Sequence, residues 1–300
     1  MRASMSTLDE ISGGTNNMAT IDKHVFEKAF RAGTNPLRMM PDFMIIGAMR
    51  GGTTSLYSYL TAHPNISPAH MKEVHFFDVY FHKGLHWYRA QFPSTVQKYY
   101  TEHIQKQTFI TGEASPYYLF HPHAPRRIAQ LLPQVKLVVL LRNPVSRAYS
   151  HYYHEVAGGH EKLTFEEAID HEEERIGQEM EKLAKNEQYV SYNHRHYSYL
   201  ARGIYVDQLR VWMDLFPKEQ FLILKSEDFY TDPAMGLKQV LQFVDVPAMG
   251  LKEQKEEYEQ LNTTKPPKMD AATRKRLHAY FEPHNARLYE YLKQDFNWDT

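Results

Sequence analysis

Apolar runs alternate with helix-like patterns along most of this chain. Strand-like runs occur at residues 43–46, 108–111, 137–141 and 221–225. Between them, apolar positions recur at helical spacing in residues 53–62, 124–132, 144–155 and 204–216. This alternation predicts an α/β fold in which a central parallel sheet is flanked by helices. The 300 residues, 42% of them hydrophobic, are enough for one substantial core.

The two ends and one internal segment depart from this alternation. Residues 1–35 are polar and lack sustained periodicity, so we expect a flexible leader with at most a short helix at 21–31, followed by a domain at 36–300. Residues 164–188 are highly charged, which is typical of a solvated surface helix and would also suit a cover over a cleft. Residues 270–292 predict a closing helix with its apolar face inward.

The first strand leads into a glycine-rich turn. Residues 41–56 read PDFMIIGAMRGGTTSL, so a strand passes through Gly51 and Gly52 and a helix begins near Thr53. Backbone N–H groups and a helix N-terminus converge on an anion in such a loop. The spacing approaches G-x-x-x-x-G-K-[ST], but Thr53 stands in place of the lysine and the cation is Arg50. We therefore expect a P-loop-like site for a phosphate-type group other than the β and γ phosphates of ATP.

A second anion site is predicted after residues 137–141. An ATPase usually places a magnesium-binding aspartate at such a strand end, whereas this chain has Arg142. Asn143 and Pro144 suit the start of a helix, and Ser150 lies on that helix. Two phosphate sites that need no metal, each after a strand, indicate a nucleotide phosphorylated at both ends.

These segments resemble the sulfotransferases that use 3′-phosphoadenosine 5′-phosphosulfate (PAPS), in particular the heparan-sulfate and related carbohydrate branch and its bacterial relatives. The resemblance runs from about residue 41 to the C-terminus. It includes GAMRGGTTS at 47–55, KEVHFFD at 72–78, GLHWYR at 84–89, GEASPY at 112–117, LRNPVSRAYS at 141–150 and YFEPHNARLY at 280–289. It implies in-line transfer of sulfonate from PAPS, without a metal, to an acceptor hydroxyl on a carbohydrate.

The resemblance also assigns roles to residues of the donor site. Arg50 is expected to bind the phosphosulfate and to support the leaving group. The rest of the first loop and the first helical turn are expected to give donors to the 5′ end, namely Gly51, Gly52, Thr53, Thr54 and Ser55. Arg142 and Ser150 are expected to hold the 3′-phosphate. Lys265, in the segment 262–268, is expected to contact a phosphate or the adenine.

On the acceptor side the resemblance points to the segment that begins at Lys72. Glu73 is expected to be the general base that takes the proton of the acceptor hydroxyl. Lys72, His75 and Glu113 are expected near the acceptor, and His75 and Glu113 are rival candidates for the base.

Bulk properties limit the partners. The formal net charge of −1 gives no global attraction for nucleic acid. The absence of cysteine excludes disulfides and thiol catalysis. No apolar run approaches the ~20 residues of a membrane span, and no secretory signal is present, so we expect a cytoplasmic protein or a soluble excised domain. None of the 17 histidines falls in a metal-binding motif, and no metal site is predicted.

Other functions remain open from the sequence. The same chemistry could act on a lipid, a carrier-bound hydroxyacyl chain or a small alcohol. A P-loop kinase is disfavoured by Thr53 and by the missing strand-end aspartate. A binding protein without turnover is disfavoured by the presence of both Glu73 and Arg50.

Overall fold

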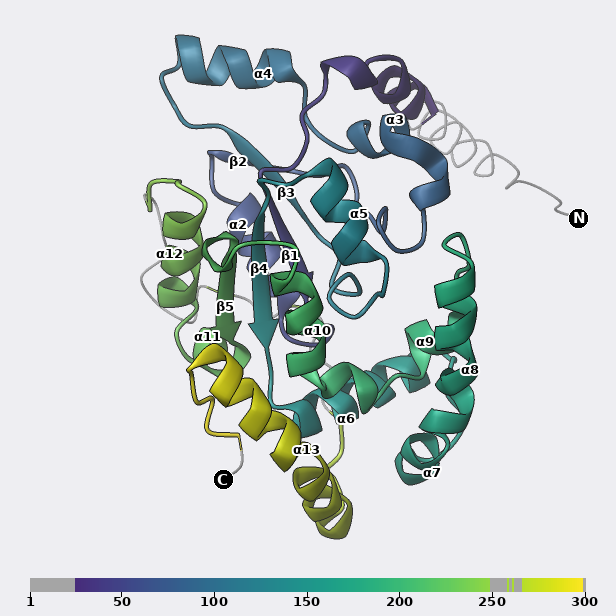
Figure 1. Cartoon of the computed structure of the whole chain (residues 1–300). Helices are drawn as coiled ribbons and strands as arrows, with labels where there is room; N and C mark the ends of the chain where they lie inside the picture. The colour runs from purple at the N-terminus through teal and green to yellow at the C-terminus, as the bar shows by residue number, and fades with distance from the viewer. Residues whose placement is uncertain (1–24, 249–257, 259–260, 262–265, 299–300) are drawn as a thin grey trace, which may run out of the picture.

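A parallel sheet forms the centre of the computed structural model, which describes residues 25–248, 258, 261 and 266–298. Within these residues the sheet has five strands in the order β2-β3-β1-β4-β5, and every pairing is parallel. The strands are β1 (Phe43–Gly47), β2 (Ile66–Pro68), β3 (Ile110–Ala114), β4 (Lys136–Leu141) and β5 (Phe221–Lys225) (Figure 1). The predicted fold class is confirmed.

The helices follow the strands in the expected alternation. They are α2 (Thr53–Thr61), α3 (Gly84–Arg89), α4 (Thr95–Tyr99), α5 (Ala124–Leu131), α6 (Pro144–Ala157), α7 (Phe165–Asp170), α8 (Glu172–Lys185), α9 (Tyr192–His196), α10 (Tyr205–Met213), α11 (Ser226–Thr231), α12 (Pro233–Phe243) and α13 (Ala271–Leu292). Single turns occur at Asn35–Leu37, Phe81–Lys83, Tyr100–Ile104, Ala201–Gly203 and Lys218–Gln220. In the described part of the chain, no helix has the length and apolar character needed to span a bilayer.

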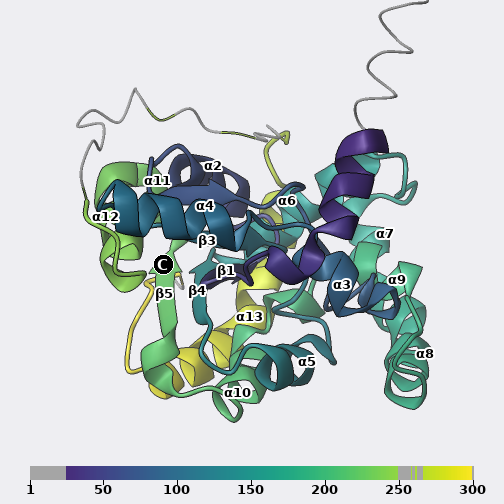
Figure 2. The same ribbon diagram turned by 90° about the horizontal axis from the view of Figure 1, so that it is seen from above.

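Both faces of the sheet are covered because successive side chains of a strand point to opposite sides. Met44 and Ile46 of β1 belong to a core shared with α10 and the end of α13, whereas Phe43 and Ile45 belong to a second core shared with α2 and α12. Figure 2 shows these helices above and below the sheet. The continuous apolar character of β1 and β4 in the sequence reflects this burial on two sides.

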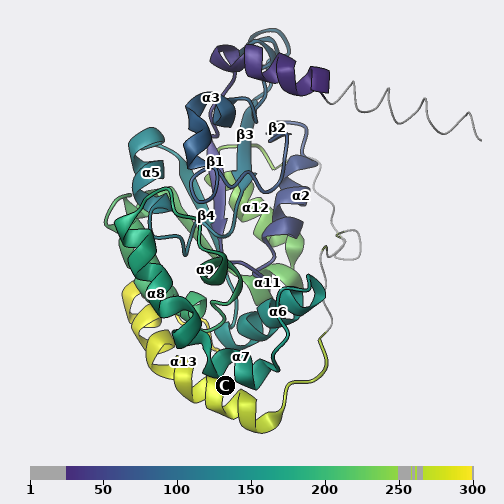
Figure 3. The ribbon, with the colours of Figure 1, turned by 90° about the vertical axis from the view of Figure 1, so that its right-hand side faces the viewer.

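A third core lies beyond the carboxyl ends of the strands. There α6, α7 and α13 pack around Val145, Tyr152, Phe165 and Phe281, and Figure 3 shows these helices gathered at one end of the molecule. Asp270 begins α13 by accepting a hydrogen bond from the Thr273 N–H at 2.9 Å. This helical layer surrounds the sheet edge at which the predicted anion sites lie.

Three local features differ from or refine the expectations. The predicted strand at 108–111 begins two residues later, as β3, and the short strand β2 was not predicted because Ile66–Pro68 contains a proline and no apolar run. Residues 25–33 are helical, and Arg31 of this helix donates hydrogen bonds to the carbonyls of Ala90 and Phe92 at 2.7 and 3.1 Å. The division at residue 35 stays a prediction.

The charged segment 164–188 forms two helices, α7 and α8, that meet at His171. The segment is not simply solvated. Glu172 is buried at the start of α8 and accepts hydrogen bonds from the N–H groups of Leu200 and Ala201 at 2.6 and 2.8 Å. Burial raises the pKa of Glu172 to about 7, although these N–H groups oppose the shift.

Candidate active site

The loop between β1 and α2 is held in one conformation by close backbone contacts. A Cβ atom at Gly51 would lie 2.6 Å from the Leu140 carbonyl oxygen and 2.9 Å from that of Ala48. Gly52 precedes α2 with φ of 100°, a region that glycine adopts readily. Only residues without a side chain fit both positions. The loop therefore brings its backbone to the N-terminus of α2, as a phosphate-binding loop requires.

Arg50, Arg142 and Ser150 meet next to this loop, although they come from three separate segments. Arg50 Nε donates to Ser150 Oγ at 3.1 Å, and Arg142 Nη1 donates to the Arg50 carbonyl at 3.0 Å. Burial lowers the pKa of the Arg50 guanidinium, and the charge of Arg142 lowers it further. Two neighbouring guanidinium groups repel each other, so an anion placed between them would be stabilised. The structure thus brings together residues that the sequence analysis assigned to two separate anion sites.

Tyr230 belongs to the same cluster and was missed by sequence reasoning. It lies on α11, and its hydroxyl would contact a Cβ at Gly52 at 2.6 Å. Burial raises the pKa of its phenol, while the charges of Arg142 and Arg50 and a hydrogen bond with Ser55 oppose the shift. The sequence did offer an indication of this position. The helix α11 follows the predicted strand at 221–225, so it begins at the same edge of the sheet as the two anion sites.

The hydroxyl side chains in the first turn of α2 have two different surroundings. Thr53 and Ser55 are buried, and Ser55 Oγ accepts a hydrogen bond from the N–H of Leu261 at 3.1 Å. Thr54 Oγ1 instead accepts a hydrogen bond from Lys72 Nζ at 3.0 Å. This contact links the anion loop to the segment that carries Glu73. Lys265 lies outside the described residues, so its expected contact stays a prediction.

Glu73 lies in a chain of charged side chains. His75 Nε2 is 2.9 Å from Glu73 Oε2, and His75 Nδ1 is 2.8 Å from Asp78 Oδ2. Lys72 Nζ lies 3.6 Å from the other oxygen of Glu73. Burial opposes ionisation of Glu73, but the hydrogen bond and charge of His75, with Lys72 and Arg195, lower its pKa overall.

The histidine in this chain is held as a cation. Burial favours neutral His75, but Asp78 and Glu73 outweigh burial and raise its pKa to about 9. His75 is therefore protonated near neutral pH and donates to both carboxylates. That state makes His75 unsuited to accept a proton and leaves Glu73 as the ionised group, with 29% of its side chain exposed.

Glu113 lies beneath this segment and does not line the pocket. It is fully buried and accepts hydrogen bonds from Tyr88 at 2.5 Å, Ser115 at 2.8 Å and Tyr118 at 3.2 Å. Ser115 Oγ in turn accepts from the N–H of His75 at 3.1 Å. Glu113 thus supports the backbone near Glu73, and the structure does not place it where it would touch an acceptor.

A pocket of about 510 Å³ opens beside Glu73. Its lining includes Lys72, Glu73 and His75 of the predicted site, and Thr54 of α2. The first loop adds Met49, and the segment after β3 adds Pro116 and Tyr117. The helical region adds His154, Glu155, His160, Arg195, His196 and Arg202. Among these, Arg195 Nη2 lies 3.4 Å from His75 Nε2. The pocket therefore joins the anion loop to a surface rich in cations and imidazoles.

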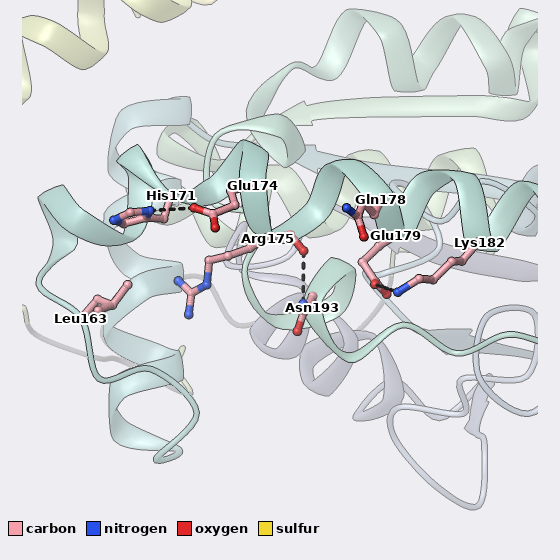
Figure 4. A pocket seen from close by; sticks show the side chains of 8 residues that line it. All are labelled: Leu163, His171, Glu174, Arg175, Gln178, Glu179, Lys182 and Asn193. Atoms are coloured by element: carbon pink, nitrogen blue, oxygen red, sulfur yellow. Dashed lines mark hydrogen bonds and ion pairs between the residues drawn. The ribbon is translucent and has the colours of Figure 1, made fainter.

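A second groove lies along α8 and is separate from this pocket. It is lined by Arg175, Gln178 and Lys182 of α8 and by Asn193 of α9, among others, and Figure 4 shows these side chains along the helix. Asn193 Nδ2 donates to the Arg175 carbonyl at 3.1 Å, and Lys182 pairs with Glu179 at 2.7 Å. In the described residues, the charged segment therefore lines this groove and not the pocket with Glu73.

Comparison with known proteins agrees with this geometry. The sulfotransferase domain model matches residues 40–284. Mouse heparan sulfate glucosamine 3-O-sulfotransferase 6 is 28% identical over 87% of this chain and 75% of its own length. The membrane-associated sulfotransferase kil1 of Dictyostelium discoideum is 27% identical over 88% of this chain and 68% of its own.

A solved structure has the same architecture. The sulfotransferase from Alicyclobacillus acidocaldarius aligns with a TM-score of 0.66 and 29% identity, over 87% of this chain and all of that one. The family match covers most of the described fold and includes the anion loop, Glu73 and Arg142. This chain therefore belongs to the sulfotransferase family and is a sulfotransferase enzyme.

Proposed function

We propose that this enzyme transfers the sulfonate group of PAPS, in line, to a hydroxyl of a carbohydrate, with Glu73 as the general base. The observation that carries the proposal is the meeting of Arg50 and Arg142 beside the first loop, next to a pocket that contains Glu73. This arrangement offers an anion site for the donor and an adjoining space for the acceptor.

PAPS carries two negative charges at each end, and the site offers one group of hydrogen-bond donors for each end. Backbone N–H groups at 51–55 and the Arg50 guanidinium would bind the phosphosulfate. Arg142 and Ser150 would bind the 3′-phosphate. The hydrogen bond between Arg50 and Ser150 brings the two anion sites side by side, as binding of both ends of one nucleotide would require. This set of residues needs no metal to bind the nucleotide.

The transfer step makes one bond and breaks one. The acceptor oxygen bonds to sulfur while the bond from sulfur to the 5′-phosphate oxygen breaks, and adenosine 3′,5′-bisphosphate leaves. Negative charge grows on the leaving oxygen, which Arg50 and Lys72 would stabilise. The hydrogen bond from Lys72 to Thr54 supports this role, because it holds the ammonium group at the first turn of α2.

Glu73 would take the acceptor proton. The contacts with His75 and Lys72 keep its carboxylate ionised at neutral pH and fix its direction. Asp78 holds His75 in turn, so three side chains orient the base. A base with a lowered pKa is weak in the ground state, and we propose that proton transfer occurs late, as charge leaves the acceptor oxygen toward sulfur.

A carbohydrate is favoured as the acceptor by the pocket and by the relatives. Mouse and human relatives are named heparan sulfate glucosamine 3-O-sulfotransferases. Arg195, His154 and His196 line the pocket beside Glu73 and can donate hydrogen bonds to hydroxyl, carboxylate or sulfate groups of a sugar.

A transfer assay with radiolabelled PAPS tests the proposal. The acceptors are heparan sulfate, a long-chain lipid alcohol, a carrier-bound hydroxyacyl chain and a small alcohol, each with wild type and with Glu73→Gln. We expect label to appear on heparan sulfate with wild type and to fall strongly with Glu73→Gln. Label only on a non-carbohydrate would refute the acceptor, and turnover of magnesium-ATP without any transfer from PAPS would refute the donor.

A further inference from the structure

Two imidazoles and one carboxylate meet in the wall of the pocket beside Glu73. Glu155 lies in the last turn of α6, His160 follows that helix, and His196 ends α9. One ligand atom from each of these three residues lies within 4.8 Å of the others. Sequence reasoning missed the group because its members are not spaced as a metal-binding motif.

The backbone after α6 is built to bring His160 back onto Glu155. Gly159 has a φ of 73°, which reverses the chain, and the N–H of His160 then donates to the Glu155 carbonyl at 2.9 Å. A Cβ at Gly158 would lie 2.7 Å from Cδ2 of His160. The two glycines thus make the turn and leave room for the imidazole.

Surrounding side chains orient two of the three groups, and the third is held by a contact within the group. Tyr192 Oη lies 2.8 Å from His160 Nδ1, so Nε2 of that ring is the nitrogen presented to a ligand. Buried His151 has its Nε2 3.2 Å from one oxygen of Glu155, and His196 Nδ1 lies 2.7 Å from the other. Metal-binding histidines and carboxylates are commonly held by such outer partners.

We propose that Glu155, His160 and His196 bind a divalent transition-metal ion, Zn²⁺ in the first place, with its remaining coordination open to the pocket. Two imidazoles with one carboxylate form a donor set that suits Zn²⁺, and an open position is typical of sites that meet a substrate. The ion would take the place of the hydrogen bond between His196 and Glu155. The site is separate from the nucleotide loop, and metal binding here does not depend on the proposed transfer reaction.

Three variants test the site, and a fourth serves as a control. His160→Gln and His196→Gln each remove one ligand. Tyr192→Phe keeps its ring beside His196 but removes the hydrogen bond to His160. His171→Gln is the control, because His171 is an exposed histidine that pairs with Glu174 at 3.1 Å in the other groove.

Calorimetric titration of the full chain, without a histidine tag, with Zn²⁺ gives the test. We expect one Zn²⁺ per wild-type chain, a loss of about 100-fold in affinity with either ligand variant, and about 10-fold with Tyr192→Phe. His171→Gln should bind as wild type. Circular dichroism checks that each variant is folded. Absence of Zn²⁺ binding to wild type, or unchanged affinity in the folded His160→Gln and His196→Gln variants, would overturn the proposal.

Discussion

Replacing buried Glu113 by glutamine should change how the stability of the protein depends on pH. Three hydroxyls donate to this carboxylate, from Tyr88, Ser115 and Tyr118. Burial nevertheless dominates, and the pKa of Glu113 is raised to about 7 from an ordinary value of 4.5. Glutamine has nearly the same shape, can accept from Tyr88 and donate to Ser115, and has no charge to desolvate.

The direction and size of the effect follow from this raised pKa. A carboxyl with a higher pKa in the folded state contributes stability that is fully present below its unfolded pKa and is lost as pH rises through the folded pKa. For Glu113 that window runs from 4.5 to about 7. At 1.36 kcal/mol per pKa unit, the wild type should lose about 2–3 kcal/mol relative to Glu113→Gln between about pH 5 and about pH 8.

Urea unfolding at several pH values within this interval measures the difference. Glu172, whose pKa is also raised to about 7, is present in both proteins. Its contribution cancels when the free energy of unfolding of the variant is subtracted from that of wild type. A difference that stays constant across the interval would refute the reasoning and mean that Glu113 titrates normally.

Two further predictions concern the anion sites. Arg142→Ala should weaken binding of adenosine 3′,5′-bisphosphate by about 2–4 kcal/mol, because a phosphate loses a charged partner. Calorimetry should show a smaller loss for a nucleotide without the 3′-phosphate, and equal losses would place Arg142 elsewhere. Gly51→Ala should destabilise the fold by about 1–3 kcal/mol, since its Cβ would meet two carbonyl oxygens at 2.6 and 2.9 Å. Thermal unfolding checks this against Gly33→Ala, where a Cβ would meet nothing within 4 Å, and similar losses would contradict it.

Much of the fold could be read from the sequence because its central strands are buried on both faces. β1, β4 and β5 appear as apolar runs, and the loops after β1 and β4 carry glycines or an arginine that mark the ligand edge. β2 could not be read in this way, since it is a short strand with a proline. Residues 164–188 appeared solvated because the buried Glu172 and Glu179 are carboxylates that accept hydrogen bonds from outside the segment, at Leu200 and at Ser191.

The donor side of the site was more predictable than the acceptor side. Arg142 follows β4 directly and Arg50 lies in the short loop after β1, so the sheet sets their positions. Helix packing and a glycine turn bring other residues to the site, namely Tyr230, Arg195 and the group of Glu155, His160 and His196. Neither of these features leaves a local pattern in the sequence. Glu113 was expected near the acceptor from the resemblance, but it is fully buried and hydrogen-bonded to Tyr88, Ser115 and Tyr118.

The measurement that tests the central claim most directly is the effect of Glu73→Gln on sulfonate transfer and on nucleotide binding in the same preparation. Glutamine can still accept the hydrogen bond from His75 but cannot take a proton. We predict that kcat falls by about 10²- to 10⁴-fold while adenosine 3′,5′-bisphosphate binds as it does to wild type. Retention of most activity by Glu73→Gln, with activity abolished in a folded His75→Ala variant, would contradict the account and identify His75 as the base.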